Sequence, residues 1–175
     1  MTEGEAAMDY PSILTPTSFY ELRLTERLVY VPKATPVFQQ WAGPPVEDSY
    51  NGKAVVYFEG EPVFAELATL RAFQGEGWHG VWIDAYMHRY RIGYWQQDAS
   101  VALPPQQEAL LKRINNGQFR GSWDVFCWKD SSIVFAKLIL KSNDKIREAQ
   151  VAWLEAALAA GLPIEFFLIV EWEMD

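Results

Sequence analysis

The segment from Trp123 to Gly161 contains the strongest secondary-structure signals of the chain. It reads WDVFCW (123–128), KDSS (129–132), IVFAKLIL (133–140), KSNDKIREAQ (141–150) and VAWLEAALAAG (151–161). Apolar runs on both sides of a short polar turn predict a hairpin of two strands, at 123–128 and 133–140. The next stretch predicts a helix over 144–160, with Asn143 or Asp144 as N-cap and Gly161 as C-cap. A strand is expected at 164–172, and a right-handed crossover makes it parallel to strand 133–140.

The flanking sequence predicts further elements. Strands are expected at 19–31, 54–58 and 81–84, where β-branched and aromatic residues are frequent. One helix begins at Pro62 and ends at Gly75 and Gly77, and another follows Pro104 and Pro105 and ends near Asn115. We therefore expect one α/β domain over 18–175, with a core at 62–172, an inserted helix and an N-terminal β segment. Residues 1–17 are expected to form a flexible tail.

Composition limits the class of protein. The 175 residues carry a net charge of -8, and half of them are apolar, which is typical of a globular chain. No apolar run approaches the roughly 20 residues of a membrane span, and the acidic start MTEGEAAMDYP differs from a signal peptide. We expect a cytoplasmic protein with no membrane partner. The single Cys127 excludes an internal disulfide, and no Cys/His zinc spacing is present.

Positive charge is concentrated in and just before the segment 123–161. Residues 111–150 hold eight Lys or Arg and four acids, a balance of +4, whereas the remainder holds seven and nineteen, a balance of -12. Such a region suits a surface that faces phosphates, although an ordinary solvated face has the same composition. The segment 86–91 interleaves aromatic and basic side chains, as nucleic-acid-binding segments do, and an exposed strand edge explains it equally well.

Three polar residues in apolar surroundings are candidates for a site. Asp124 interrupts the run WDVFCW, which favours a site carboxylate, with a turn cap as the alternative. Gln150 shares an apolar helical face with Ile146 and Trp153 and therefore requires an internal hydrogen-bond partner. Glu66 lies in the amphipathic helix that follows Pro62, where a surface Glu is the simpler interpretation.

These motifs together resemble the PD-(D/E)XK nuclease superfamily, and in particular its VRR-NUC-type branch. Asp124 is similar to the Asp of the first hairpin strand, and Gln150, Trp153 and Leu154 are similar to residues of the following helix. The second strand departs from the family pattern, because FAKLILKSND stands where FAELKLKSND is expected. Lys137-Leu138-Ile139 thus replaces Glu-x-Lys. The resemblance implies a restriction-endonuclease-like αβββαβ core with a mixed sheet.

The same resemblance implies an ancestral chemistry, the cleavage of DNA, including branched or structured DNA. It implies Mg²⁺ or Mn²⁺ on Glu66 and Asp124, with Asp124, Gln150 and the positions of Lys137 and Ile139 as catalytic positions. Lys137 neutralises the carboxylates that would bind the ion, and Ile139 has no group to position water. The site is therefore expected to be degenerate and weak or inactive, with its metal affinity lost and either Mg²⁺ or Mn²⁺ or no metal in this chain.

Strand alternation gives a geometric expectation for the site. Lys137 and Ile139 share one strand face, while Ala136, Leu138 and Leu140 are expected to point into the core. Glu66, Asp124, Lys137 and Gln150 are expected to converge, with the Asp124 carboxylate and the Lys137 side chain within about 10 Å, close enough for direct or water-mediated contact. Nucleic-acid contacts are expected from Lys141, Lys145, Arg147, Arg89 and Arg91.

Three functions remain open on this sequence. The first is a nuclease whose active form carries Glu and Lys at positions 137 and 139, for which Lys141 or Lys145 is a candidate replacement for the lost Lys. The second is a non-catalytic DNA-binding module, and the third is a protein-interaction module on the same fold. DNA, a second copy of the chain and another protein are thus the partners to consider.

Overall fold

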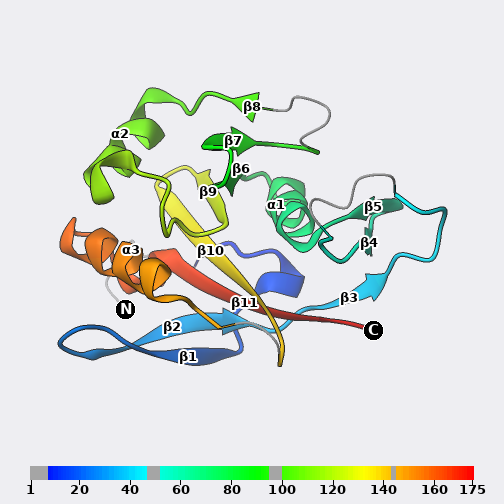
Figure 1. Cartoon of the computed structure of the whole chain (residues 1–175), viewed down its shortest axis with the longest axis horizontal. Coiled ribbons are helices and arrows are strands. Elements are labelled where there is room, and N and C mark those ends of the chain that lie inside the picture. The colour runs from blue at the N-terminus through cyan, green and yellow to red at the C-terminus, as the bar shows by residue number, and fades with distance from the viewer. Residues whose placement is uncertain (1–7, 47–51, 95–99, 143–144) are drawn as a thin grey trace.

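The central hairpin and its neighbour organise the chain, which a computed structural model describes over residues 8–46, 52–94, 100–142 and 145–175 (Figure 1). β9 (Val125–Lys129) runs antiparallel to β10 (Ser132–Leu140). The chain then passes through α3 (Glu148–Ala159) and returns as β11 (Phe167–Met174), which lies beside β10. β10 and β11 are parallel, so the predicted direction of the last strand is confirmed.

The described strands form one mixed sheet in the order β5-β4-β3-β11-β10-β9-β6-β7-β8, and β1 joins it through β2, which also pairs with β11. Their bounds are β1 (Ser18–Arg23), β2 (Leu28–Ala34), β3 (Val37–Gln40), β4 (Val56–Phe58), β5 (Glu61–Val63), β6 (His79–Asp84), β7 (Arg89–Arg91) and β8 (Ser100–Val101). β6 and β10 flank β9, and both run antiparallel to it. The mixed α/β class predicted from the sequence is confirmed.

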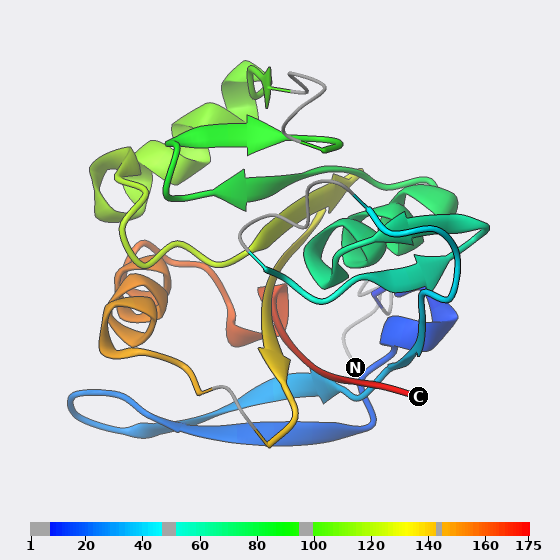
Figure 2. The ribbon, with the colours of Figure 1, turned by 45° about the vertical axis from the view of Figure 1, so that its right-hand side comes forward.

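Helices cover both faces of this sheet (Figure 2). α1 (Ala65–Gly75) packs into one apolar cluster, which includes Ala136, whereas α2 (Pro105–Arg113) and α3 pack into a second cluster, which includes Phe135. Both Phe135 and Ala136 are 0% exposed, so β10 is buried on both faces. Strands of this kind are continuous apolar runs rather than alternating patterns, and IVFAKLIL is such a run apart from Lys137.

Element boundaries in the N-terminal half differ from the prediction. The stretch 19–31 is a hairpin of β1 and β2, closed where the Leu24 N–H donates to the Arg27 carbonyl over 2.8 Å. The turn contains neither Gly nor Pro, so the sequence gives no sign of it. The predicted helix start at Pro62 is also wrong, because Pro62 lies within β5 and α1 begins at Ala65.

The start of α3 also lies later than predicted. The helix begins at Glu148 with Arg147 as N-cap, whereas the expected caps Asn143 and Asp144 fall outside the described residues. Its end lies one residue earlier than predicted, because Ala160 rather than Gly161 is the C-cap. Gly161 follows with a φ of +99°, a left-handed conformation that suits glycine after a helix. None of the described helices has the length and apolar character required to cross a bilayer.

The segment before β1 packs against the domain. Leu14, in a short 3-10 turn, is 0% exposed and belongs to the α1 cluster. The Asp9 carbonyl accepts a hydrogen bond from Trp78 Nε1 at 2.9 Å, and the Asp9 carboxylate pairs with Lys129. The expected flexible tail over 1–17 is therefore wrong for residues 8–17, because this segment buries an apolar side chain and makes polar contacts.

Candidate functional site

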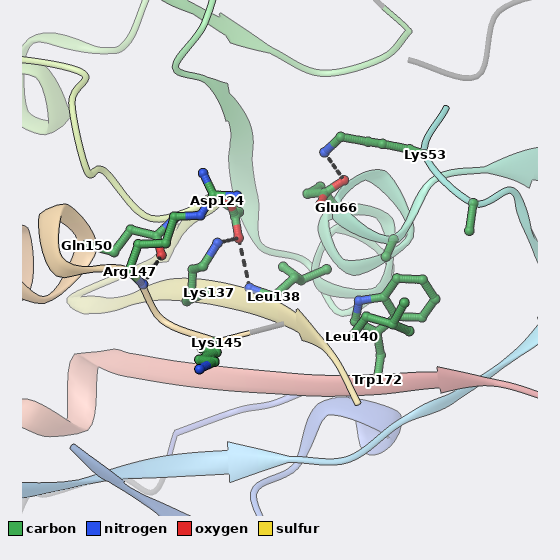
Figure 3. Close-up of a pocket in the computed structure, with 12 residues that line it drawn as sticks. Lys53, Glu66, Asp124, Lys137, Leu138, Leu140, Lys145, Arg147, Gln150 and Trp172 are labelled. Atoms are coloured by element: carbon green, nitrogen blue, oxygen red, sulfur yellow. Dashed lines mark hydrogen bonds and ion pairs between the residues drawn. The ribbon is translucent and has the colours of Figure 1, made fainter. Parts of the chain in front are cut away.

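A cavity of about 450 Å³ lies where the N-terminal ends of α1 and α3 meet the end of β10 (Figure 3). Its described charged lining residues are Lys53, Glu66, Asp124, Lys137, Lys145 and Arg147. They come from the loop before β4, from α1, from the residue before β9, from β10 and from the segment that leads into α3. Residues far apart in the sequence are thus assembled around one concave surface.

Asp124 is held at the centre of the cavity by two donors. Its backbone N–H donates to the Ala136 carbonyl over 2.9 Å, so the hairpin pairing continues by one residue and places Asp124 opposite Lys137. Lys137 Nζ donates to Asp124 Oδ2 at 3.1 Å, and the Leu138 backbone N–H donates to the same oxygen at 2.8 Å. One carboxylate oxygen is therefore satisfied by an ammonium and an amide.

Glu66 forms the second ion pair of the cavity. It lies in the first turn of α1, where the helix dipole favours a carboxylate, and its side chain is 16% exposed. Lys53 Nζ lies 2.9 Å from Glu66 Oε2. Desolvation lowers the pKa of Lys53, but the carboxylates of Glu66, Asp124 and Asp84 outweigh it, so the pKa is raised above its ordinary value. Lys53 is therefore held as a cation beside Glu66.

Gln150 organises the start of α3 rather than contacting the carboxylates. Its Oε1 accepts the Arg147 backbone N–H at 2.8 Å, and the Gln150 N–H donates to the Arg147 carbonyl at 2.9 Å. Trp123 Nε1 donates to the Gln150 carbonyl at 3.1 Å, which ties the helix to the residue preceding Asp124. The internal partner expected for this amide is thus the helix start itself, and the arrangement fixes the backbone from which Arg147 extends.

The expected convergence of Glu66, Asp124, Lys137 and Gln150 is observed, since all four line the cavity. The 3.1 Å between Lys137 Nζ and Asp124 Oδ2 is far below the expected limit of about 10 Å for direct or water-mediated contact.

The prediction for Ile139 is wrong. Its side chain is 2% exposed and belongs to the apolar cluster of Phe135 and Trp153, so it does not line the cavity. Leu138 and Leu140 pack into the α1 cluster, as expected, and they also line the cavity. The reason is that β10 is buried on both faces, so its apolar residues do not reveal which face borders the site. Lys137 reaches the cavity because it lies opposite Asp124 at the end of the hairpin pairing.

The expected nucleic-acid contacts divide into two groups. Lys145 and Arg147 line the cavity, and both are exposed. Lys141 lies outside it, 56% exposed, with Nζ 3.7 Å from Glu173 Oε2. Arg89 is exposed on β7, away from the cavity lining, and its Nη1 lies 3.4 Å from Ser100 Oγ.

Arg91 cannot contact a nucleic acid in this structure, and that prediction is wrong. It is 3% exposed, and its Nε donates to Asp84 Oδ2 at 2.9 Å. Its guanidinium also lies over the Trp82 ring, 6.0 Å from the ring centroid. The pair of Arg91 and Asp84 therefore stabilises the hairpin of β6 and β7, where Trp82 and Arg91 are opposite each other.

Sequence reasoning missed two features of the cavity. Lys53 lies in a polar stretch after Gly52 with no motif around it, so nothing in the sequence connects it to Glu66. The apolar wall, which includes Leu140 and Trp172, was also missed. Trp172 belongs to β11, and only the parallel pairing of Leu140 with Trp172 brings the two residues together.

The cavity does not fit a divalent metal. Among the described residues, no group of three His, Cys, Asp or Glu could hold an ion. The two carboxylates of the lining, Glu66 and Asp124, each pair with a lysine, and residues 137–140 of β10 supply no carboxylate on either face. Mg²⁺ and Ca²⁺ require several oxygen ligands that are free to coordinate. The two ammonium groups thus supply the positive charge that an ion would otherwise bring.

The described lining is cationic. Lys53, Lys137, Lys145 and Arg147 face Glu66 and Asp124, so four positive charges minus two negative charges leave +2. Comparison of the chain with protein-family models, with curated proteins and with solved structures finds no match. What the cavity can do therefore follows from its own side chains, which favour an anion.

Proposed function

We propose that the chain is a PD-(D/E)XK-like domain, of VRR-NUC type in its motif, that binds DNA through the cationic cavity without cleaving it. The element order α1, β6, β9, β10, α3, β11, with α2 inserted after β6, supports the restriction-endonuclease-like core. Asp124 next to β9 and Gln150 in the first turn of α3 support the same assignment. We also propose a cytoplasmic location, as expected from the sequence.

The hydrogen bond from Lys137 Nζ to Asp124 Oδ2 carries the proposal of inactivity. Metal-dependent phosphodiester cleavage uses a divalent ion to stabilise the developing charge and to activate water. Here the Lys137 ammonium pairs with the Asp124 carboxylate, and the amine cannot act as a metal ligand while it is protonated. The other β10 residues that border the cavity, Leu138 and Leu140, have neither a carboxylate for an ion nor an amine for water. The cavity therefore lacks the groups for metal-dependent cleavage and retains its positive charge.

Lys145 and Arg147 are the groups that support DNA binding. Both line the cavity, and within the part of the chain that the structure describes no carboxylate pairs with either. Two phosphate contacts to single-stranded DNA give a slope of log K against log salt of about -1.4. Binding is thus expected to be moderate and to weaken at high salt, as suits a protein with a net charge of -8.

Fluorescence anisotropy with labelled branched, single-stranded and duplex DNA tests this function. We expect binding in EDTA, unchanged by Mg²⁺, and intact DNA on a denaturing gel after prolonged incubation with Mg²⁺ or Mn²⁺. The double variant Lys145→Gln/Arg147→Gln should weaken binding at least tenfold. Its matched control is Lys112→Gln/Arg27→Gln, which removes the same charge from two exposed residues outside the cavity and should bind as the wild type does. Cleavage of any substrate contradicts the proposal.

The excess of acids outside residues 111–150 favours a second candidate, a protein-interaction module on the same fold. That part of the chain has a balance of -12, which repels DNA over most of the surface. This alternative prevails if none of the DNA substrates binds at low salt. In that case the double variant and its control behave alike, because neither affects a DNA contact.

A further inference from the structure

We propose that the cavity recognises a phosphomonoester dianion attached to an apolar or aromatic group, either a mononucleotide or the phosphorylated end of a DNA strand. This inference rests on the proposed function, because it names the part of a nucleic acid that the cavity binds. Three properties of the described lining lead to it: its charge, its size and the separation of its polar and apolar walls.

The charge of the lining matches a terminal phosphate better than an internal one. The described side chains sum to +2, from four cations and two carboxylates. A phosphomonoester carries about -1.5 to -2 charges at pH 7, whereas each phosphodiester of a DNA backbone carries one negative charge. Because Lys53 and Lys137 already pair with Glu66 and Asp124, the excess positive charge resides on Lys145 and Arg147. Arg147 has a planar guanidinium that can bind two phosphate oxygens at once.

The size of the cavity suits one nucleotide. Its volume of about 450 Å³ lies within the 300–1,000 Å³ range of sites that enclose a small organic ligand. A DNA duplex, whose major groove alone is about 12 Å wide, is far too large to enter. Only a mononucleotide or a strand end can therefore use the interior of the cavity, while internal phosphates reach its rim.

Figure 3 shows Arg147 and Gln150 at one side of the cavity and an apolar wall at the other side, below the ion pair of Lys53 and Glu66. Arg147 lies with Gln150 at the start of α3, where helix N–H groups and the helix dipole favour an anion. Leu140 and Trp172 lie at the other end, beyond Leu138. We place the phosphate at the α3 end and the sugar and base against Leu140 and Trp172. Inorganic phosphate has no apolar group to pack against this wall, so the wall adds nothing to its binding affinity.

Isothermal titration calorimetry in EDTA, which removes any contribution of metal ions, tests the inference. The probes are inorganic phosphate, thymidine, thymidine monophosphate, and a short single strand with a 5′-phosphate, with a 3′-phosphate or with hydroxyls at both ends. We expect the monophosphate to bind at least tenfold more tightly than thymidine and than inorganic phosphate. Arg147→Gln should weaken monophosphate binding about tenfold, and Lys112→Gln should leave it unchanged.

A second variant separates the two walls of the cavity. Leu140→Ser should weaken the monophosphate while leaving inorganic phosphate as weak as before, and circular dichroism checks that each variant is folded. If strand binding depends on a terminal phosphate and the mononucleotide also binds, the inference is supported. A strand that requires its terminal phosphate while the mononucleotide fails to bind also supports it, and identifies the strand end as the source.

Strands that bind equally well with and without a terminal phosphate overturn this inference and leave the DNA-binding function intact. Strands that do not bind in any form, together with a mononucleotide that does not bind, overturn both.

Discussion

Lys137→Glu replaces the ammonium beside Asp124 with a third carboxylate, and it reverses the charge at the centre of the cavity. The side chains of Lys137 and Asp124 are 11% and 23% exposed, so their pair lies between the surface and buried cases. Surface pairs contribute about 0–1 kcal/mol, and breaking a buried pair costs about 3–5 kcal/mol. We therefore expect the free energy of unfolding of the metal-free variant to fall by about 2 kcal/mol, which lowers Tm by about 4–8 °C for a chain of this size.

Mn²⁺ should reverse this loss in the variant and leave the wild type unchanged. With Glu66 and Asp124, the introduced carboxylate completes a set of three oxygen ligands of the kind that hard cations bind. An ion present at 100 times its Kd stabilises the native state by about 2.7 kcal/mol, or about 5–10 °C in Tm. Differential scanning fluorimetry measures the shift in Tm as the MnCl₂ concentration is raised in tenfold steps, with a sample in EDTA as the reference.

Lys141→Glu is the matched control, because it introduces the same charge at a residue that is 56% exposed and outside the cavity. We expect its Tm to be independent of Mn²⁺. A wild-type Tm that rises by several degrees with Mn²⁺ refutes the reasoning, since it shows that the ion already binds beside Lys137. A Lys137→Glu variant that responds no more than Lys141→Glu refutes the assignment of the carboxylates as potential ligands.

Three further predictions concern the packing and titration of the domain. Ile139→Lys should lower the free energy of unfolding by about 3 kcal/mol or more, because it places an ammonium among apolar side chains. Leu140→Lys, at the cavity, should lower it much less. Equal urea midpoints for the two variants contradict the assignment of Ile139 to the core. Burial raises the pKa of the Cys127 thiol, so a disulfide reagent should react only after unfolding, and rapid reaction with the native protein contradicts its burial. Burial, and next the Glu165 charge, raises the pKa of Tyr10 to about 12. The unfolded phenol, with a pKa near 10, loses its proton first, so the unfolding free energy should fall by roughly 2–3 kcal/mol between about pH 10 and pH 12. Tyr10→Phe should lack this component in urea titrations at increasing pH, and identical pH slopes contradict it.

The sequence predicts the central elements because several local signals agree there. The run WDVFCW and the run IVFAKLIL each have the length of a strand, the polar turn separates them, and Gly161 ends the helix that follows. The juxtaposition of Asp124 and Lys137 follows from hairpin pairing alone, since residues on adjacent antiparallel strands face each other across a short turn. Local pairing is therefore readable from one sequence.

The sequence does not show in the same way which face of β10 borders the cavity, or what surrounds an isolated charged residue. Strand alternation places Ile139 and Leu140 on opposite faces of β10, but in a strand buried on both faces their residue types do not show which face borders the cavity. Arg91 has the sequence context of a surface residue, and only the hairpin of β6 and β7 buries it against Asp84. Lys53 reaches Glu66 across a loop, and such long-range pairs leave no periodic signal in the sequence.

Anomalous diffraction from crystals grown with Mn²⁺ shows whether the Lys137 ammonium stands in place of a metal ion, because it locates the ion and the Lys137 side chain in one experiment. We expect no anomalous peak between Glu66 and Asp124, and electron density for Lys137 Nζ within hydrogen-bond distance of Asp124 Oδ2, as in the 3.1 Å contact. A strong Mn²⁺ peak coordinated by both carboxylates, with Lys137 displaced from Asp124, contradicts it.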